Sequence, residues 1–534
     1  MIVTPMNANA APLSTDRLGL LNTLEQTKQV DMVVIGGGAT GLGVALDAAL
    51  RGLSVVVLEA GDLAGGTSSR ATKLVHGGIR YLAQGNVSLV REALHERATF
   101  LRIAPHLAQP LGFIMPSYKC WETPFYGLGL KAYDALAGKD GLGSTEFLNA
   151  YRTQKALPGV KRHGLKGGVM YWDAQFDDAR MALALARSAV AASALVVNYC
   201  KVTELVHEND RVTGVRCQDV FTRQAFSVRA KCVINATGVW VDEIRQMDST
   251  VSARHNKSLV SPSQGVHLVV DRDFMPGEHA LLVPKTRDGR VLFAVPWLGK
   301  LILGTTDTPT QSLEKEPQAF PEEVNFILNE AAHYLERPPS RADVRSIWVG
   351  LRPLVKATAN EDATKSLSRE HTVVVSPSGL LTVTGGKWTT YRAIADDVLE
   401  HCQRAGLLPR LSSARTAQHR LIGASSTPVK RDLSEGADLR SYGDEAAFVN
   451  TLEGRGVEII EGLSEAMVRF AARYEYALTV EDVLARRVRT LFLDARLAAK
   501  AAPRVAEVLL QETGRDPQLA EFLALATHYA TVPD

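Results

Sequence analysis

A short apolar strand, a glycine-rich turn and a helix near the N-terminus restrict the fold of this chain more than any other feature. Residues 32–35 form the apolar strand, and the turn that follows has the spacing G-x-G-x-x-G between Gly36 and Gly41. A helix of small residues and a second apolar strand, residues 55–58, come next and end at Glu59, eighteen residues after Gly41. This order predicts a βαβ unit that binds a dinucleotide.

Each residue of this unit has a physical reason to be there. Gly36 permits the tight turn, Gly38 lets the backbone approach a pyrophosphate, and Gly41 lets the helix pack on the strand. The helix N-terminus faces the phosphates, and Glu59 would accept hydrogen bonds from the adenosine ribose.

Composition limits the remaining possibilities. A chain of 534 residues is longer than one ordinary core, and 60 Lys and Arg against 58 Asp and Glu give a net charge of +2. That balance offers no broad basic surface, so nucleic acid is not expected as a partner. The five cysteines lie far apart without a C-x-x-C pair, which argues against a metal centre or disulfides and favours a reducing, cytoplasmic compartment. Residues 181–198 are apolar but contain Arg187, and this pattern predicts a buried helix that runs into a strand.

A second signature separates FAD from NAD. An apolar strand at residues 231–234 leads into Asn-Ala-Thr-Gly at residues 235–238, which resembles the second motif of FAD-containing oxidoreductases. No second complete glycine fingerprint follows, so one dinucleotide is expected. Alternating segments predict hairpins at residues 196–218, turning at Asn209 and Asp210, and at residues 293–306. The last 135 or so residues have the composition of helices, including a capped start at residues 479–482.

The loop of residues 65–82 has an unusual concentration of hydroxyls, glycines and cations among apolar residues. Such a segment is suited to wrap phosphates and a flavin, because its backbone amides and hydroxyls are all hydrogen-bond donors. Its sequence, Gly-Thr-Ser-Ser-Arg and then Thr-Lys-Leu-Val-His-Gly-Gly-Ile-Arg-Tyr-Leu, resembles the quinone-linked FAD-dependent glycerol-3-phosphate dehydrogenase family. Further blocks that match this family in order lie at residues 264–269, 304–307, 350–354, 368–371 and 384–392.

The resemblance implies an α/β fold of the D-amino-acid-oxidase and glycine-oxidase type, with a Rossmann-like FAD-binding domain, a β-rich substrate domain and a C-terminal all-helical domain. The expected boundaries are an N-terminal arm at 1–29, interleaved domains at 30–395 and the helical domain at 396–534. Within the interleaved part, the FAD domain takes mainly residues 30–100, 165–260 and 345–395, and the substrate domain mainly 101–164 and 261–344.

The resemblance also implies oxidation of sn-glycerol 3-phosphate to dihydroxyacetone phosphate, with electrons passing through FAD to a membrane quinone. Arg80, Arg352 and Lys387 are the expected clamp for the phosphate, and they are predicted to act in catalysis. His267 is the expected catalytic base, with His76 as the alternative, because a neutral imidazole accepts a proton near pH 7. Substrate contacts are expected from Arg80, Tyr81, His267, Arg352, Arg369 and Lys387, and Asp307 is a candidate to orient the base.

The predicted FAD contacts combine the βαβ unit, the loop and the family blocks. They are Gly36, Gly38, Gly41, Glu59, Thr67, Ser68, Ser69, Lys73, Leu74, His76, Val202, Ala236, Gly238, Gly386, Lys387, Trp388 and Thr389.

Several alternatives stay open at this stage. A glycerol-3-phosphate oxidase would share fold, FAD and substrate but use O2 and release H2O2; a non-catalytic flavin-binding scaffold and an amine oxidase of the same fold are further readings. The quinone implies peripheral association with the inner face of the cytoplasmic membrane, and residues 15–29 could form an amphipathic helix that lies there or docks on the protein. A homodimer is a further open expectation.

Overall fold

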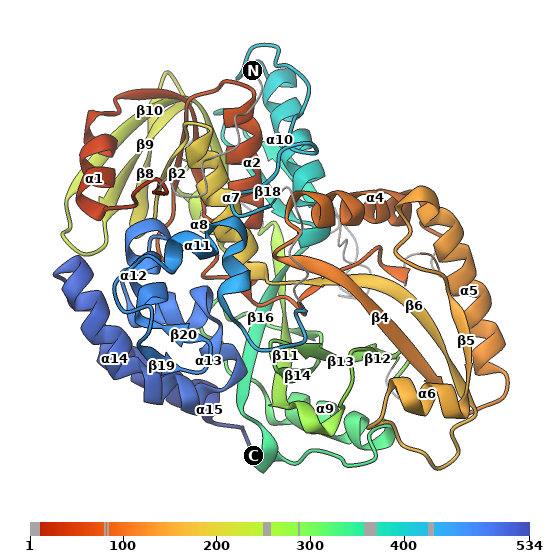
Figure 1. Ribbon diagram of the computed structural model, residues 1–534. Helices are drawn as coiled ribbons and strands as arrows, with labels where there is room; N and C mark the ends of the chain where they lie inside the picture. Colours follow the sequence, from red (N-terminus) through yellow and green to blue (C-terminus); the bar gives the residue numbers. More distant parts are fainter. Residues whose placement is uncertain are drawn as a thin grey trace.

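The computed structural model describes residues 11–79, 82, 85–248, 258–286, 289–356, 371–425 and 432–534. Two large sheets form its framework, and helices cover them on the outside (Figure 1). Three of the residues predicted to bind substrate, Arg80, Tyr81 and Arg369, lie outside the described residues.

The first sheet contains the predicted βαβ unit. Its strands are β1 (Gln29–Ile35), β2 (Val55–Leu58), β7 (Leu195–Val197), β8 (Cys200–Glu208), β9 (Arg211–Asp219), β10 (Ala225–Asn235), β17 (His371–Val375) and β18 (Leu381–Gly385). They lie in the order β17-β18-β10-β1-β2-β7, and β8 and β9 extend from β10. The central strand β1 is parallel to both β2 and β10, so the glycine turn leaves the sheet at the carboxyl ends of its strands.

Three helices form the layer beside these parallel strands. They are α2 (Ala39–Leu50), α7 (Asp178–Ala191) and α10 (Tyr391–Arg404), and α2 contacts both of the others. Figure 1 shows them beside the first sheet. The run at residues 181–198 forms α7 and β7, as its pattern predicts.

Both predicted hairpins are present. β8 and β9 turn at Asn209 and Asp210, whose φ angles are +51° and +59°. In the second sheet, β13 and β14 turn at Leu298 and Gly299, with φ of +45° and +81°. Left-handed residues at both positions of a two-residue turn match the right-handed twist of the flanking strands.

The second sheet is larger and mostly antiparallel. Its strands are β3 (Leu74–Val75), β4 (Ala108–Ser117), β5 (Glu146–Asn149), β6 (Gly167–Phe176), β11 (Val260–Asp271), β12 (Ala280–Val283), β13 (Leu292–Trp297), β14 (Lys300–Gly304), β15 (Thr308–Pro309) and β16 (Ser346–Val355). β11 pairs with β14 on one side and with β16 over ten positions on the other. β6 and β16 are strands of this sheet although their residues fall in segments assigned mainly to the FAD domain; the domain boundaries themselves stay predictions.

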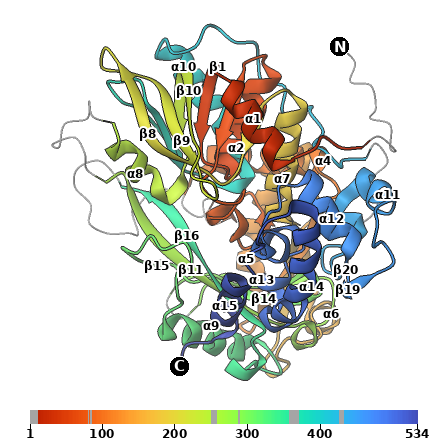
Figure 2. The ribbon, with the colours of Figure 1, turned by 90° about the vertical axis from the view of Figure 1, so that its left-hand side faces the viewer.

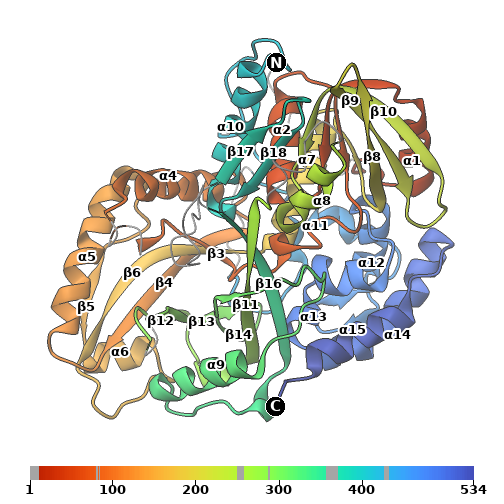
Figure 3. The ribbon, with the colours of Figure 1, turned by 180° about the vertical axis from the view of Figure 1, so that it is seen from behind.

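The outer helices of this half are α4 (Val87–Ile103), α5 (Glu122–Ala137), α6 (Ala150–Ala156) and α9 (Pro321–Tyr334). Figure 3 shows β16 as a long strand that lies between β11 and the C-terminal helices. α8 (Val241–Gln246) follows β10, and α1 (Arg17–Gln26) contacts β7 and β10 and buries Leu21 and Leu24. The N-terminal helix therefore docks on the protein.

The C-terminal region is helical, with one small exception. Its helices are α11 (Ala446–Val449), α12 (Glu465–Tyr474), α13 (Thr490–Leu493), α14 (Ala495–Thr513) and α15 (Leu519–Ala530), and a two-stranded ribbon joins β19 (Glu458–Ile460) to β20 (Leu463–Ser464). The capped start at Thr479 and Asp482 is present, but a π-helix, Asp482–Arg487, follows it where a regular helix was expected. Figure 2 shows these helices packed below the first sheet. Among the described residues, none of the helices combines the length and apolarity needed to cross a bilayer.

Candidate active site

The glycine turn after β1 has the geometry that a pyrophosphate requires. Gly36 has φ of +110°, and a Cβ there would lie 2.6 Å from the Ala236 carbonyl oxygen. A Cβ at Gly41 would lie 2.0 Å from the Gly36 oxygen, so the turn and α2 pack too closely for a side chain. Gly38 is the N-cap of α2 and has no side chain to cap the helix, whereas the first helical amide, that of Ala39, donates to Ser68 Oγ at 2.9 Å. The partial positive charge at this helix start favours an anion, and the close-packed turn fits the phosphates of FAD.

Glu59 directly follows β2 and lies beside this turn. Its carboxylate accepts hydrogen bonds from the backbone N–H of Gly37 at 2.7 Å and of Gly61 at 2.8 Å. Burial raises the pKa of Glu59, whereas the two amides favour its ionised form. The carboxylate is thus held at the sheet edge where an adenosine ribose would lie.

Two loops that are far apart in sequence meet at the start of α2. Ser68 lies in the 3-10 turn η1 (Thr67–Ser69), and its Oγ accepts from the Ala39 N–H at 2.9 Å. From the turn η7 (Trp388–Thr390), the Trp388 indole N–H donates to the Ser68 carbonyl at 2.8 Å. The backbone N–H of His76 donates to Thr389 Oγ1 at 3.3 Å. These contacts bring residues predicted to bind FAD from the two loops into one cluster at the phosphate end.

The other predicted FAD residues lie in several different elements. Thr67 Oγ1 donates to the Leu351 carbonyl at 2.6 Å, and Thr384 Oγ1 donates to the Gly238 carbonyl at 3.0 Å. Gly386 has φ of +80°, as the turn from β18 into η7 requires. Ser69, Leu74 and Val202 are buried, in η1, β3 and β8 respectively. Their contacts with FAD stay predictions.

His267 lies on β11 in a fully enclosed setting. Its ring stacks on Trp348 with 4.0 Å between the centroids and 17° between the planes. Nε2 lies 3.0 Å from Thr72 Oγ1, and Nδ1 is buried with no hydrogen-bond partner among the described residues. Burial, reinforced by the charges of Lys73 and Arg352, lowers the pKa of His267 well below that of an ordinary histidine. The imidazole is therefore held neutral, as a proton acceptor must be.

The guanidinium of Arg352, a residue of β16, lies over the same face of β11 as the His267 ring. A Cβ at Gly265 would lie 2.4 Å from the Arg352 guanidinium, and Gly265 is two residues from His267 on the same strand. Because side chains two apart on a strand project to the same face, the guanidinium lies on the face that presents the imidazole. Its Nη1 donates to Asp307 at 3.2 Å and to the Thr306 carbonyl at 3.0 Å. The candidate base and one candidate phosphate ligand are thus brought together.

Lys387 lies in the turn between β18 and η7, and β18 contacts β16, the strand of Arg352. Asp307, a candidate to orient the base, accepts hydrogen bonds from Arg352 and from Ser263 Oγ at 2.5 Å. Its contacts place it beside Arg352, a candidate ligand of the substrate phosphate.

Sequence reasoning missed two residues that contact His267. Thr72 and Trp348 both lie in or next to blocks used for the resemblance, but neither residue type alone indicates a site. Trp348 lies opposite His267 through the pairing of β11 with β16, and Thr72 reaches it from the loop before β3; no local pattern shows either contact.

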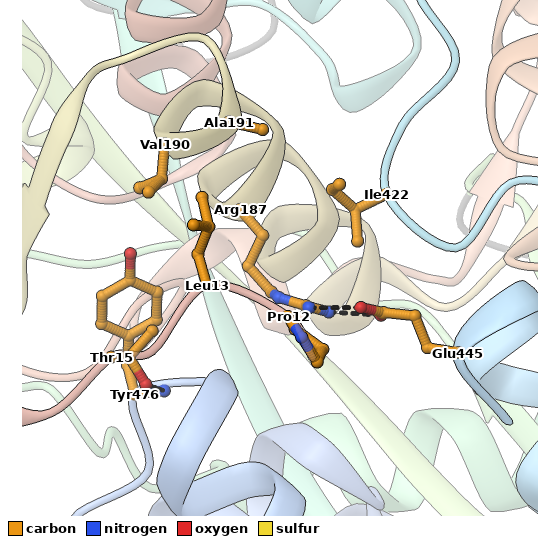
Figure 4. Close-up of a pocket in the computed structure, with 9 residues that line it drawn as sticks. All are labelled: Pro12, Leu13, Thr15, Arg187, Val190, Ala191, Ile422, Glu445 and Tyr476. Carbon is orange, nitrogen blue, oxygen red and sulfur yellow. Dashed lines mark hydrogen bonds and ion pairs between the residues drawn. The ribbon is translucent and has the colours of Figure 1, made fainter. Parts of the chain in front are cut away.

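A small cavity lies elsewhere, at the seam between the N-terminal arm, α7 and the C-terminal region (Figure 4). Leu13, Val190 and Ile422 contribute apolar lining, and Arg187 forms two hydrogen bonds of 2.5 Å with Glu445. None of the predicted site residues lines this cavity.

Comparison with known proteins shows which families the chain is similar to. Residues 31–392 match the family described as FAD dependent oxidoreductase, and residues 414–520 match the C-terminal domain of alpha-glycerophosphate oxidase. The mitochondrial glycerol-3-phosphate dehydrogenase of Bos taurus is 41% identical over 535 residues, which cover 93% of this chain and 72% of that protein.

Solved structures agree with these matches. The glycerol-3-phosphate dehydrogenase from Bacillus halodurans, solved as a complex with FAD, superposes with a TM-score of 0.76 and 29% identity over 96% of this chain and 98% of that one. The glycine oxidase from Geobacillus kaustophilus shares the fold, with a TM-score of 0.52 and 21% identity over 71% of this chain and 95% of that one.

Proposed function

The chain belongs to the FAD-dependent glycerol-3-phosphate dehydrogenase family, and from this premise we propose that it oxidises sn-glycerol 3-phosphate to dihydroxyacetone phosphate and passes the electrons to a membrane quinone. The predicted family, the FAD cofactor and the fold, with its C-terminal helical domain, are confirmed by the matches.

The observation that supports the reaction most directly is the pairing of a neutral His267 with Arg352 on one face of β11. Oxidation of a secondary alcohol removes a hydride from carbon and a proton from the hydroxyl, and a phosphorylated substrate also needs a cation. His267 supplies a proton acceptor and Arg352 supplies a guanidinium within reach of the same face.

We propose that Nδ1 of His267 is the atom that accepts the proton of the substrate hydroxyl. This atom is buried and lacks a partner within the described part of the chain, whereas Nε2 faces the Thr72 hydroxyl. A buried polar atom without a partner is costly, so a substrate hydroxyl placed there would satisfy it. FAD, when bound, supplies the hydride acceptor, and the cluster formed by η1 and η7 would hold it.

Arg352 is the proposed ligand of the substrate phosphate. Its guanidinium is about one quarter exposed and already lies near Asp307, so a phosphate dianion would compete for the same N–H groups. Lys387 and the predicted Arg80 would add charge. Each charge-assisted hydrogen bond contributes about 1.5–3 kcal/mol, so loss of one arginine should weaken substrate binding by roughly tenfold to a hundredfold.

The electron acceptor distinguishes this proposal from an oxidase. The C-terminal match to a domain of alpha-glycerophosphate oxidase keeps O2 as the second candidate. Turnover of sn-glycerol 3-phosphate should be followed with a soluble quinone analogue under argon, and then with O2 alone while H2O2 is measured. We expect full turnover with the quinone and little peroxide; equal turnover with O2 and stoichiometric H2O2 would assign the oxidase reaction.

We also propose that the enzyme binds the inner face of the cytoplasmic membrane peripherally. A surface on α5 and α6 supports this, because it exposes Trp121, Phe125, Leu128 and Tyr151, while Lys119 lies over Trp121 at 5.9 Å. Residues 118–166 have eight Lys and Arg against four Asp and Glu, a net charge of +4 in a chain of +2. Exposed aromatic residues among lysines suit an anionic lipid surface.

Vesicle sedimentation tests this surface. We expect the enzyme to bind vesicles that contain phosphatidylglycerol, and the double variant Phe125→Ser/Leu128→Ser to lose most of that binding. Leu510→Ser, on α14, is the matched control because Leu510 is also exposed. Equal binding by the double variant and the control would contradict the assignment.

A further inference from the structure

Lys73 is the least expected side chain near the site. It is fully buried, and its ammonium group donates to the Ser69 carbonyl at 2.8 Å and to Asp178 at 2.7 Å. The FAD contact expected for this residue stays a prediction, but the structure shows that its charge is directed to these two acceptors.

Aromatic rings surround the same ammonium group. The Nζ atom lies 4.6 Å from the ring centroid of Trp348, 5.2 Å from that of Trp297 and 5.4 Å from that of Phe492. A desolvated cation at these distances is attracted to the ring electrons and restricts the position of the indole. Trp348 is the ring on which His267 stacks at 4.0 Å. One indole therefore contacts both the buried cation and the proposed proton acceptor.

A C-terminal residue shares the acceptors of Lys73. Arg489 precedes α13 with φ of +66°, and its guanidinium donates to the Ser69 carbonyl at 2.6 Å and lies 3.2 Å from Asp178. Figure 3 shows α13 beside β16, the strand of Trp348. The charged groups around Lys73 are thus Asp177 and Asp178 on the α7 side and Arg489 from the C-terminal region. The charged groups that act on His267 are Lys73 and Arg352.

We propose that Lys73 is a positioning residue for the proton acceptor: held by Ser69 and Asp178, it fixes Trp348 against His267 and places a positive charge near the buried imidazole. This inference rests on the proposed function of His267. It assigns to the C-terminal region a part in the reaction, because Arg489 helps to fix the carbonyl and carboxylate that hold Lys73.

The sign of the electrostatic effect follows from the charges. Burial lowers the pKa of Lys73 to about 7, with Asp178 opposing and Arg489 reinforcing the effect, so the ammonium form predominates below neutral pH. In that range its positive charge disfavours protonation of His267. Removal of the charge should therefore raise the pKa of His267 and shift the acid limb of the reaction upward. Lys73 and His267 are separated by the indole of Trp348, which both contact. At that separation we expect the loss of the charge to raise the pKa of His267 by about one unit.

The variant Lys73→Met tests this while it leaves Asp178 paired with Arg489. Lys73→Arg retains the charge, and Lys73→Gln removes it while it retains a hydrogen-bond donor, in case the methionine variant does not fold. Lys231→Met, at an exposed site on β10, controls for the change in net charge. FAD content is measured for each variant by its absorbance.

Two readouts are compared. The first is the titration of His267 in enzyme labelled with ¹³C at histidine Cε1, assigned with His267→Gln; it needs no substrate and so is independent of the proposed reaction. The second is the pH profile of anaerobic FAD reduction. We expect the Met and Gln variants to raise both midpoints by about one pH unit, so that below the wild-type midpoint FAD reduction is roughly tenfold slower than in the wild type, while the rates at pH 8 agree. Arg and the Lys231 control should match the wild type.

Three results would overturn the inference. One is an unchanged His267 titration in folded Lys73→Met or Lys73→Gln enzyme. Another is a rate loss of equal size at every pH, which would indicate a structural role only. The third is loss of FAD from both neutral variants with retention in Lys73→Arg, which would assign Lys73 to the cofactor. If the wild-type enzyme fails to reduce FAD with sn-glycerol 3-phosphate, the proposed function fails while the titration still decides the inference.

Discussion

The two nitrogens of the His267 ring have different surroundings. Nε2 faces a hydroxyl at 3.0 Å, and Nδ1 is enclosed without a partner among the residues that the structure describes. Because burial and two nearby cations lower the pKa of this ring in the folded protein, folding favours its neutral form. That preference stabilises the protein above the ordinary histidine pKa of about 6.5, and the stabilisation is lost as the pH falls below it.

At this scale we predict that His267→Gln lowers the rate of FAD reduction by about 10²–10⁴, because glutamine can contact Thr72 but cannot accept the proton. FAD content should not change. The wild-type rate should remain near its maximum at pH 6 and fall only at more acidic values. Anaerobic stopped-flow measurements from pH 5 to 9 check both statements, and a variant within about fivefold of the wild type would exclude His267 as the acceptor.

At the scale of elements, the turn between β1 and α2 depends on how closely the chain approaches itself. Gly36 meets the backbone after β10, while Gly52, which follows α2, has a similar φ of +89° but no described atom within 4 Å of a Cβ built there. Substitution at these two glycines therefore separates the free-energy cost of a side chain in the left-handed backbone region from the cost of a steric clash.

We therefore predict that Gly36→Ala loses FAD and that Gly52→Ala retains it. Both variants should lose about 1 kcal/mol of stability from the backbone conformation, but only Gly36→Ala also displaces the Ala236 carbonyl. FAD absorbance per protein and thermal unfolding give the comparison. Retention of full FAD by Gly36→Ala would show that the turn can relax.

Local signals explain which elements could be predicted from sequence. The βαβ unit follows from apolar runs and glycine spacing, and the hairpins follow from turn residues such as Asn209 and Asp210. The ten-position pairing of β11 with β16 joins segments about 85 residues apart, and it sets Trp348 against His267. The contact of Arg489 with Asp178 spans 311 positions. Such contacts depend on the whole chain, so no window of residues indicates them.

At the scale of the whole molecule, buried ion pairs join the C-terminal region to the loop that follows Glu59. The Asp62 carboxylate is fully buried and binds both Arg486 and Arg487 from the π-helix, the latter with one hydrogen bond of 2.9 Å. Asp62 lies just before the loop that contains Ser68 and Lys73. Docking of the C-terminal region is thereby coupled to the shape of the loop that is predicted to bind FAD.

Arg487→Met should consequently destabilise the protein by roughly 3–5 kcal/mol, because it leaves a buried carboxylate with one partner fewer. The double variant Asp62→Asn/Arg487→Met should recover part of that loss and retain more FAD than the single variant. Denaturant unfolding with matched FAD measurements provides the test. If the two changes are simply additive, Asp62 and Arg487 do not interact as the structure indicates.

The most direct test of the whole account is anaerobic mixing of the FAD-loaded enzyme with sn-glycerol 3-phosphate while the flavin absorbance near 450 nm is followed. We predict complete bleaching in the wild-type enzyme, with dihydroxyacetone phosphate formed in a one-to-one ratio to FAD, and a substrate requirement roughly tenfold to a hundredfold higher in Arg352→Ala. Flavin that stays oxidised at saturating substrate, in folded enzyme with full FAD content, would contradict the proposed reaction.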